Sequence, residues 1–356
     1  MRDVWFDGRF INPTRPDGIT SFSLGLVGEL SRLMPVTVLI HLEAQRHLMP
    51  ENVSVVKVND PTSLRELTLA KRLNQASIGV LISPMQTTSS LGRNFKLVLT
   101  LHDLIYYRHR TPPRAFSAPV RLGWILFHLS YFPQRFLLDR ADLVLTVSET
   151  SKQQILEARL TKRPLEVVHN ASELEISKPI RPRHDSKYLI YMGSYSRYKN
   201  VEFLIESMTL LPEKTLVLLS RLSDKKQRKL TKLASSVGAK VQFENGVTDA
   251  EYLGWLGKAF GLVSASKDEG FGIPLVEAMS QGLPVIVSDI PIFQEVAGKA
   301  GVFFDNSKPE EFVAGVMKLS EEKTWSNYSK AALQQSSRFS WKRSTQELLA
   351  SLREIA

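Results

Sequence analysis

The sequence of 356 residues contains no cysteine, which excludes disulfide bonds, thiolate catalysis and zinc sites built on cysteine. No stretch approaches the roughly 18 uninterrupted apolar residues of a transmembrane helix, so none is expected. The N-terminal segment MRDVWFDGRF carries charges throughout and lacks the apolar centre of a signal peptide. We therefore expect a soluble protein of the cytoplasm.

The motifs of two familiar site classes are missing as well. No strand-like run leads into the Gly-x-Gly-x-x-Gly fingerprint of dinucleotide binding, which argues against a nicotinamide oxidoreductase. The seven histidines show no metal-ligand spacing, and the interval from His41 to His47 does not fit a helical zinc pair. An Asp-x-Asp metal pair is also missing. We expect no bound metal and no cofactor.

Acidic residues are in short supply. The chain has 36 Asp and Glu against 46 Lys and Arg, and the net charge of +10 favours anionic partners such as nucleic acid, a membrane surface or a phosphorylated substrate. The basic residues are scattered and no nucleic-acid-binding motif accompanies them, so nucleic acid is not the expected partner. The basic run within 223–238 is interpreted as the solvated face of a helix that Ser223 caps and Gly238 ends.

Short apolar runs rich in β-branched residues alternate with helical patterns along the chain. Strands are predicted at 36–42, 78–83, 96–103, 142–148, 165–170, 187–194, 215–220, 241–244, 261–266 and 283–289. Helices are predicted between them, for example at 18–33, 148–160 and 199–211. Runs that are apolar on both faces suit a parallel sheet between helix layers, so the sequence predicts an α/β fold with two Rossmann-like doubly wound domains.

A segment with mixed charge and two prolines, 171–186, separates two similar halves. We interpret it as a linker between an N-terminal domain at 1–170 and a C-terminal domain at 187–339. Such domains bind their ligands at the carboxyl ends of the strands.

One stretch at a predicted strand end is dense in turn residues: SKDEGFGIPLVEAMSQGLPVIVSD, 266–289. Pro274 suits the first turn of a helix and Gly282 suits its end. The N–H groups of residues 271–273 would then lie at a helix N-terminus, which attracts anions.

Two carboxylates accompany this helix start. Glu269 would lie on the turn and Glu277 in the second turn of the helix, where both could accept hydrogen bonds from sugar hydroxyls. On spacing alone, a second interpretation stays open, in which Glu269 caps the helix and Glu277 is solvated.

The stretch resembles the signature of family 4 retaining glycosyltransferases of the GT-B fold, whose two spaced glutamates contact the nucleotide-sugar donor. Other stretches fall in the family's order along nearly the whole chain: TLHDLI (100–105), ADLVLTVSETSK (141–152), VVHNAS (167–172), YMGSYSRYKN (191–200), NGVTDAEY (245–252) and FSW (339–341). The resemblance implies two Rossmann-like domains facing a central cleft, an acceptor domain first and a donor domain second. The C-terminal helix, about 340–356, is expected to pack back on the first domain.

The resemblance also implies roles for single residues. Glu277 resembles the glutamate that holds the nucleotide ribose, and Glu269 the one beside the donor sugar hydroxyls. Lys199 matches the lysine that neutralises the donor diphosphate, while Tyr198 stands where the family usually has an arginine. The other expected donor-site residues are Arg197, Gly18, Val247, Gly270, Phe271, Gly272 and Ile273.

Three of these assignments concern other parts of the chain. Gly18 matches an N-terminal glycine turn that approaches the phosphates, and the backbone at Val247 is expected to contact the base. His102 matches a histidine near the donor sugar and is expected to act in catalysis with Lys199 and Glu269. A lone histidine at a strand end is more often structural, so the role of His102 rests on the resemblance.

The function implied is that of a metal-independent retaining glycosyltransferase. Lys199, Arg197 and the helix N-terminus can compensate the charge of a departing diphosphate. Retention without an obvious nucleophile favours front-face attack, with the departing phosphate taking the acceptor's proton. We expect transfer of a hexose, with mannose from GDP-mannose favoured, to a glycan or lipid-linked acceptor. A UDP- or dTDP-sugar donor, or a non-catalytic relative that only binds sugar nucleotides, is the alternative.

Residues 112–140 interleave aromatic and aliphatic residues with Arg114, Arg121, Arg135 and Arg140. A buried core helix is the favoured interpretation. The alternative is an interfacial segment that docks on anionic lipid or holds a lipid-linked acceptor. In that case the protein would lie peripherally on the cytoplasmic face of a membrane.

Overall fold

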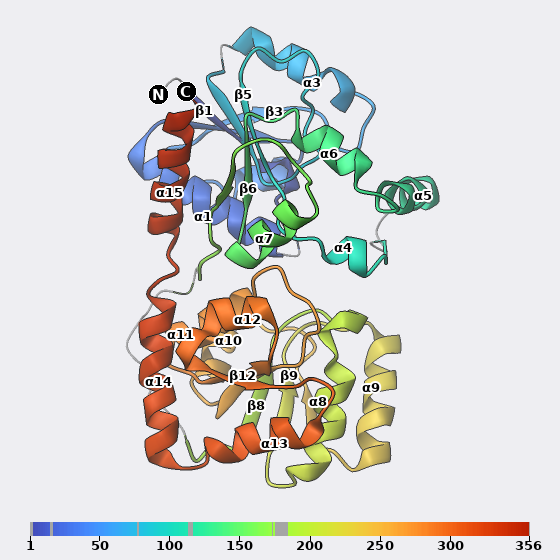
Figure 1. The fold of residues 1–356 in the computed structure, drawn as a ribbon, viewed down its shortest axis with the longest axis vertical. Helices are drawn as coiled ribbons and strands as arrows, with labels where there is room; N and C mark the ends of the chain where they lie inside the picture. The colour runs from blue at the N-terminus through green and yellow to red at the C-terminus, as the bar shows by residue number, and fades with distance from the viewer. Residues whose placement is uncertain are drawn as a thin grey trace. The chain divides into compact units, whose positions relative to one another are not determined.

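The computed structural model describes residues 3–14, 17–76, 78–112, 117–172, 174 and 184–355. The chain forms two compact units, which comprise Met1–Glu173 with Ser340–Ala356, and Leu174–Phe339. Each unit is built on one parallel sheet covered by helices, so the predicted pair of Rossmann-like doubly wound domains is confirmed (Figure 1). Most of the predicted linker at 171–186 lies outside the described residues.

The first unit contains a seven-stranded sheet in the order β3-β2-β1-β4-β5-β6-β7. Its strands are β1 (Val4–Asp7), β2 (Val36–Ile40), β3 (Ser54–Lys57), β4 (Val80–Ser83), β5 (Lys96–Thr100), β6 (Leu143–Thr146) and β7 (Leu165–Val167). Val4 of β1 is in register with Val36 of β2 and with Val80 of β4. The order reverses between β1 and β4, which makes their carboxyl ends the switch point of this sheet.

The second unit contains a six-stranded parallel sheet in the order β10-β9-β8-β11-β12-β13. Its strands are β8 (Tyr188–Tyr191), β9 (Thr215–Leu218), β10 (Val241–Phe243), β11 (Gly261–Ser264), β12 (Val285–Ser288) and β13 (Gly301–Phe304). Here the switch point lies between β8 and β11, where Leu262 is in register with Ile190.

Helices lie in most of the connections between successive strands (Figure 1). The α-helices are α1 (Gly18–Leu33), α2 (Glu43–Arg46), α3 (Glu66–Leu73), α4 (Ile105–Arg108), α5 (Ala118–Phe127), α6 (Phe132–Leu138), α7 (Glu149–Glu157), α8 (Val201–Ser207), α9 (Asp224–Val237), α10 (Asp249–Leu256), α11 (Ile273–Ser280), α12 (Pro291–Ala297), α13 (Pro309–Lys318), α14 (Glu322–Ser336) and α15 (Trp341–Glu354). Short 3₁₀ turns are η1 (Gly8–Phe10), η2 (Asn74–Ala76), η3 (Arg197–Lys199), η4 (Met208–Leu210) and η5 (Gly298–Ala300).

Side-chain caps fix several helix starts at the predicted places. Ser223 accepts a hydrogen bond from the Lys226 N–H at 3.4 Å, and Gly238 ends α9 with a positive φ of 69°. The exposed residues of this helix include most of its basic run, as expected. Asp17 caps α1 in the same way, because its carboxylate accepts from the Thr20 N–H at 2.9 Å.

The C-terminal helix α15 packs on α1 within the first unit. Trp341 lies edge-on to Phe22, with the ring centroids 6.3 Å apart. Its indole also covers Gly25, where an added Cβ would lie 2.1 Å from Trp341 Cε2. Ser344 donates a hydrogen bond to the His169 carbonyl at 2.7 Å, which ties α15 to the segment after β7.

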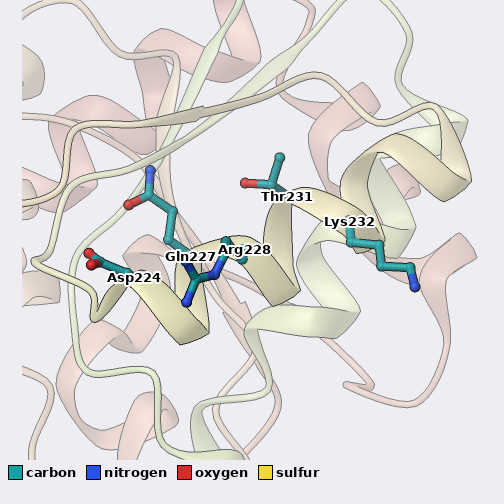
Figure 2. A pocket seen from close by; sticks show the side chains of 5 residues that line it. All are labelled: Asp224, Gln227, Arg228, Thr231 and Lys232. Carbon is teal, nitrogen blue, oxygen red and sulfur yellow. The ribbon is translucent and has the colours of Figure 1, made fainter.

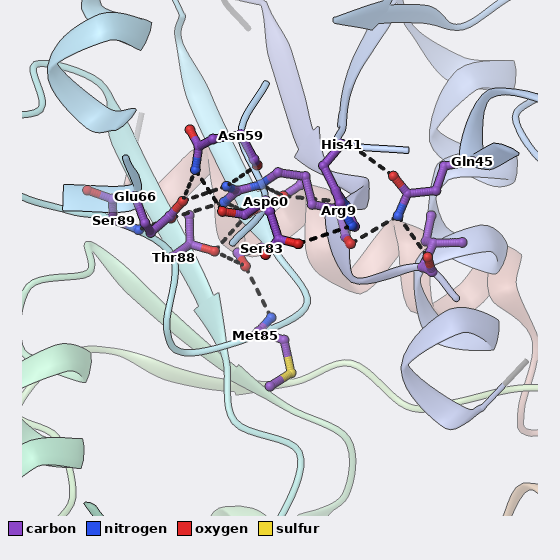
Figure 3. Close-up of polar contacts among 12 residues, drawn as sticks. Arg9, His41, Gln45, Asn59, Asp60, Glu66, Ser83, Met85, Thr88 and Ser89 are labelled. Atoms are coloured by element: carbon purple, nitrogen blue, oxygen red, sulfur yellow. Dashed lines mark hydrogen bonds and ion pairs between the residues drawn. The ribbon is translucent and has the colours of Figure 1, made fainter. Parts of the chain in front are cut away.

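A buried ionic network lies at the carboxyl ends of β1 and β4, the switch point of the first sheet (Figure 3). The fully buried Arg9 donates to Asp7 through Nε and Nη2, both at 2.7 Å, and to Glu66 through Nη1 at 2.6 Å. Thr88 donates to Asp7 at 2.8 Å and lies 2.7 Å from the Ser83 hydroxyl. The network therefore connects the end of β1 to the loop that follows β4.

The favoured interpretation of 112–140 as a buried core helix is wrong. The segment forms α5 and α6, and α5 has no buried residue. Residue 114 and its neighbours 113, 115 and 116 lie outside the described residues. Helical apolar periodicity alone does not distinguish a core helix from one whose apolar side chains face solvent.

Candidate functional site

The carboxyl ends of β8 and β11 carry the residues that sequence reasoning assigned to the diphosphate and sugar. The chain leaves β8 through Gly193 and η3, which contains Arg197 and Lys199. It leaves β11 through the loop that contains Glu269 and leads into α11. Because these two strands flank the switch point, both loops reach the place where parallel α/β sheets bind ligands.

Lys199 and Glu269 form an ion pair at this point, between the Nζ and Oε1 atoms. Both side chains are largely buried, with 14% and 13% of their surface exposed. Ser266 also donates a hydrogen bond to Glu269 Oε1, at 3.2 Å. The main chains of the two loops join as well, since the Lys267 N–H donates to the Tyr198 carbonyl at 2.7 Å. The structure thus brings Lys199 and Glu269 together as one charged cluster.

The glutamate loop is held from the side of β12 and β13. Ser288 Oγ and Asn306 Nδ2 both donate to the Ser266 carbonyl, at 2.5 and 3.2 Å. Asn200 Nδ2 in turn donates to the Asn306 carbonyl at 3.2 Å. These bonds connect the lysine loop and the glutamate loop to a common support, so the positions of the two charged side chains depend on each other.

Gly193 is a site residue that sequence reasoning did not single out, although it lies in the YMGSYSRYKN stretch. Its φ of 152° is unfavourable for a side chain, and a Cβ there would lie 3.0 Å from Tyr191 Oη. Tyr191 Oη donates to the Ser194 carbonyl at 2.6 Å. Burial first, and then the nearby Glu269 carboxylate, raise the pKa of the Tyr191 phenol well above its usual value. The sequence signal that could have identified Gly193 is a glycine shortly after a strand that borders the switch point.

The helix that follows Glu269 begins as the sequence predicted. Gly272 caps α11 with a φ of 95°, and Pro274 lies in the first turn. Gly282 follows the helix with a φ of 71°. Phe271 points its side chain into the second unit, where it packs edge-on against Phe339 with ring centroids 5.4 Å apart. Phe271 therefore anchors the turn, and Gly270, Gly272 and Ile273 supply backbone at the start of the helix.

Glu277 lies in the second turn of α11 and is partly buried. The buried phenol of Tyr252, on α10, lies near this carboxylate. Burial first, and then Glu277, raise the pKa of that phenol well above its usual value. The interpretation in which Glu277 is simply solvated is therefore not what the structure shows.

Two other donor-site candidates lie at the same edge of the sheet. Val247 is partly buried and precedes Thr248, the N-cap of α10, in the turn after β10. Arg197 begins η3 and is exposed, two residues before Lys199.

The remaining candidates belong to the first unit. Gly18 is the exposed first residue of α1. His102 follows β5, is partly buried, and lies edge-on to Phe22 of α1 with ring centroids 5.1 Å apart. Its Nε2 lies 2.9 Å from the Pro84 carbonyl, in the loop fixed by the network of Arg9. Burial lowers the pKa of His102 below its usual value, partly offset by the Pro84 hydrogen bond and by Asp17.

A neutral His102 with its proton on Nε2 donates to Pro84 and keeps Nδ1 as an acceptor. The histidine is thus positioned by the carboxyl end of the first sheet, as Lys199 and Glu269 are by the second.

Other features of the described residues do not contribute to these sites. A hollow on α9 is lined by Asp224, Gln227, Arg228, Thr231 and Lys232 (Figure 2). All five belong to one face of a single helix, and four of them are exposed. Within the described ranges, no three His, Asp or Glu side chains are grouped so that they could hold a metal ion.

Residues 172–335 match the family model of glycosyl transferases group 1. This segment is thus similar to glycosyl transferases group 1 domains. It contains Lys199, Glu269 and Glu277, so the resemblance seen in the sequence is confirmed for the part of the chain that carries the charged cluster.

Curated relatives are similar over part of the chain. The O-antigen chain mannosyltransferase B of Escherichia coli is 28% identical over 233 residues, which cover 60% of this chain and 60% of that protein. The GDP-mannose:cellobiosyl-diphosphopolyprenol alpha-mannosyltransferase of Xanthomonas campestris is 32% identical over 143 residues, 38% of each chain. The chain thus spans less than two thirds of the length of these relatives.

A solved structure is similar over the whole chain. The sucrose-phosphate synthase of Thermosynechococcus elongatus matches with a TM-score of 0.78 at 16% identity, and covers 100% of this chain and 99% of that one. At this identity the likeness shows the fold alone.

Proposed function

We propose that this protein is a glycosyltransferase that moves mannose from GDP-mannose to a glycan or lipid-linked acceptor, with retention of configuration and without a metal ion. The observation that carries the proposal is the Lys199–Glu269 pair at the switch point of the segment that is similar to glycosyl transferases group 1 domains. A cation for the diphosphate and a carboxylate for the sugar hydroxyls stand side by side there.

The donor would lie across the carboxyl ends of β8 and β11. An ammonium group has three donors, so Lys199 can bind phosphate oxygens when the donor enters. The N-terminus of α11 attracts the same anion, and Gly193 lets the ligand approach the backbone closely. Glu277 would accept from the ribose hydroxyls while Glu269 accepts from the sugar.

The chemical step follows from this placement. The bond between the anomeric carbon and the diphosphate oxygen breaks, and the acceptor oxygen bonds to that carbon on the same face. The departing phosphate takes the acceptor's proton, so the site needs no side-chain nucleophile. Lys199, Arg197 and the α11 N-terminus stabilise the charge that develops on the leaving group. The neutral His102, with Nδ1 as an acceptor, would orient a hydroxyl of the sugar or of the acceptor.

Mannose and GDP are favoured because the curated relatives are named as mannosyltransferases and one is named for GDP-mannose. That relative is also named for a polyprenol-linked acceptor, and a lipid-linked acceptor suits the positive net charge of +10. We propose a cytoplasmic protein that contacts a membrane peripherally.

A thermal-shift screen with GDP, UDP, dTDP and ADP in the presence of EDTA tests the proposal. A nucleotide at 100 times its Kd stabilises the folded state by about 2.7 kcal/mol. For a domain of this size that corresponds to several degrees in Tm, at about 2–4 °C per kcal/mol. We expect the largest shift with GDP. A larger shift with UDP or dTDP would favour the alternative donors, and no shift with any nucleotide would contradict the proposed function.

Binding does not distinguish an enzyme from a relative that only holds sugar nucleotides. Transfer of labelled mannose from GDP-mannose to polyprenyl-diphosphate-linked oligosaccharides makes that distinction. We expect labelled lipid-linked product from the wild type. GDP binding without transfer to any glycan or lipid-linked acceptor would support the non-catalytic alternative.

A further inference from the structure

Helix α5, helix α6 and the turn between them expose several large apolar side chains, which we together call the α5–α6 face. It consists of Val120, Leu122, Ile125, Leu126, Leu129, Phe132 and Phe136, and between 37% and 73% of each residue is exposed. On α5, residues 122, 125 and 126 share one side of the helix by their spacing, and Leu129 lies in the turn after the helix. On α6, Phe132 and Phe136 share one side in the same way.

The opposite side of α5 is firmly attached to the unit. Trp124 lies edge-on to Tyr106 of α4 with ring centroids 5.2 Å apart, and 4.0 Å from the His128 ring. The buried His128 also packs against Tyr107 at 4.9 Å, and its Nδ1 lies 2.8 Å from the Trp124 carbonyl. Trp124 thus attaches α5 to the first unit, while Leu122, Ile125 and Leu126 are exposed to solvent.

The charged residues of the stretch that forms this face have one sign. The stretch 104–138 contains no Asp or Glu but contains arginines at 108, 110, 114, 121 and 135. Arg121 lies on α5 itself and is exposed, as is Arg110. Arg135 is not directed to lipid, because it donates hydrogen bonds to the carbonyls of Ala158 and Arg159 at 2.8 and 2.9 Å. It thereby caps the C-terminal end of α7.

We propose that the α5–α6 face docks on the surface of an anionic lipid bilayer. Apolar side chains in a stretch whose Asp, Glu, Lys and Arg residues are all arginines match an acyl boundary beneath negatively charged headgroups. A second copy of this chain is a poorer match, because a symmetric contact would place two arginine-bearing surfaces against each other. None of the described helices has the length and apolarity needed to cross a bilayer.

Docking would take place in the plane of the membrane. A helix of ten residues such as α5 can lie along the headgroup boundary with Leu122, Ile125 and Leu126 directed inward. The guanidinium of Arg121 can extend from the same helix to lipid phosphates. The docking itself does not depend on the proposed function. Its role in the reaction rests on that function, because a lipid-linked acceptor is reached at the membrane surface.

The test is co-sedimentation with vesicles of phosphatidylcholine alone or with about a third phosphatidylglycerol, using the Leu126→Glu and Met317→Glu variants. Leu126 and Met317 are equally exposed, at 57% and 56%, but Met317 belongs to α13 of the second unit. We expect the wild type and Met317→Glu to bind the anionic vesicles, less at high salt, and Leu126→Glu to bind at least tenfold more weakly. Neutral vesicles should bind none of the three strongly.

Two further readouts keep the outcome interpretable. Thermal unfolding and the GDP-induced shift of Leu126→Glu should match those of the wild type, which separates loss of docking from loss of folding or of donor binding. The inference would be overturned if the wild type did not bind anionic vesicles, or if both variants lost vesicle binding equally. A GDP-induced shift in the same protein would show that donor binding, and with it the proposed function, is unaffected by that result. Sedimentation velocity without lipid would overturn it in favour of self-association if the wild type dimerises and Leu126→Glu does not.

Discussion

Lys199 and Glu269 lie 70 positions apart in the chain and form an ion pair where β8 and β11 end. The pair gives each residue a partner before any donor arrives. A diphosphate would then compete with Glu269 for the lysine, and the released carboxylate would become available to sugar hydroxyls.

Glu269→Gln tests this exchange. The amide keeps the size of the side chain but removes the charge that holds Lys199, so GDP should bind as well as to the wild type or several-fold more tightly. GDP-mannose should lose roughly tenfold in affinity relative to GDP, because a charge-assisted bond to sugar hydroxyls is worth about 1.5–3 kcal/mol. Calorimetric titration of both ligands measures the ratio. An unchanged ratio would place Glu269 away from the sugar.

Glu277→Gln should weaken GDP binding by about tenfold or more, since a carboxylate that accepts from ribose hydroxyls makes bonds of about 1.5–3 kcal/mol. The exposed Glu310 on α13 offers a matched control, and Glu310→Gln should bind as the wild type does. Circular dichroism checks that both variants are folded. Equal GDP affinity in the two variants would refute the ribose assignment.

Two glycines of α1 form a matched pair that tests the packing of α15. Gly25→Ala places a methyl group 2.1 Å from the Trp341 indole, whereas nothing lies within 4 Å of a Cβ at Gly28. The first change should destabilise the protein by about 1–3 kcal/mol through overpacking. The second should be neutral or stabilise it by up to about 1 kcal/mol, through helix propensity. Urea unfolding measures both. Similar effects would mean that α15 does not pack on α1 as described.

His102 should make the protein less stable in acid. Its pKa is lowered in the folded state by burial, so the unfolded chain takes up the proton first and stability falls as the pH drops below about 6.5. His41 and His128 also have pKa values lowered by burial and add to the same loss. In His102→Gln, the slope of unfolding free energy with pH should decrease by up to about 1.4 kcal/mol per pH unit. The exposed His47 gives the control. If His47→Gln changes the slope as much as His102→Gln, the burial argument fails.

The strands that sequence reasoning found are the apolar β-branched runs, and all of them are present in the structure. Sequence reasoning missed β1, β3 and β13, and for the first two the structure shows a physical reason. β1 is short and lies among charged residues, yet it lies inside the first sheet between β2 and β4. Its Asp7 is tolerated in the core because Arg9 neutralises it. β3 is an edge strand whose side chains are mostly exposed, so it lacks an apolar pattern.

The candidate site was predicted in its residues but not in its contacts. The spacing of Glu269, Pro274 and Gly282 predicted the turn and helix, because these residue types have strong local preferences. The pairing of Lys199 with Glu269, the Tyr252 phenol beside Glu277 and the exposure of α5 depend on tertiary packing. A linear pattern carries no information on which element covers which.

The central claim is that Lys199 binds the donor diphosphate without help from a metal ion. Calorimetric titration of GDP into the wild type, Lys199→Met and the control Lys330→Met, each with EDTA and with Mg²⁺, tests it most directly. The account predicts that the wild type binds GDP with equal affinity in EDTA and in Mg²⁺. Lys199→Met should bind GDP about tenfold or more weakly. Lys330 is an exposed residue of α14, and Lys330→Met should bind GDP as the wild type does. Binding that disappears in EDTA and returns with Mg²⁺, or that survives intact in Lys199→Met, would contradict it.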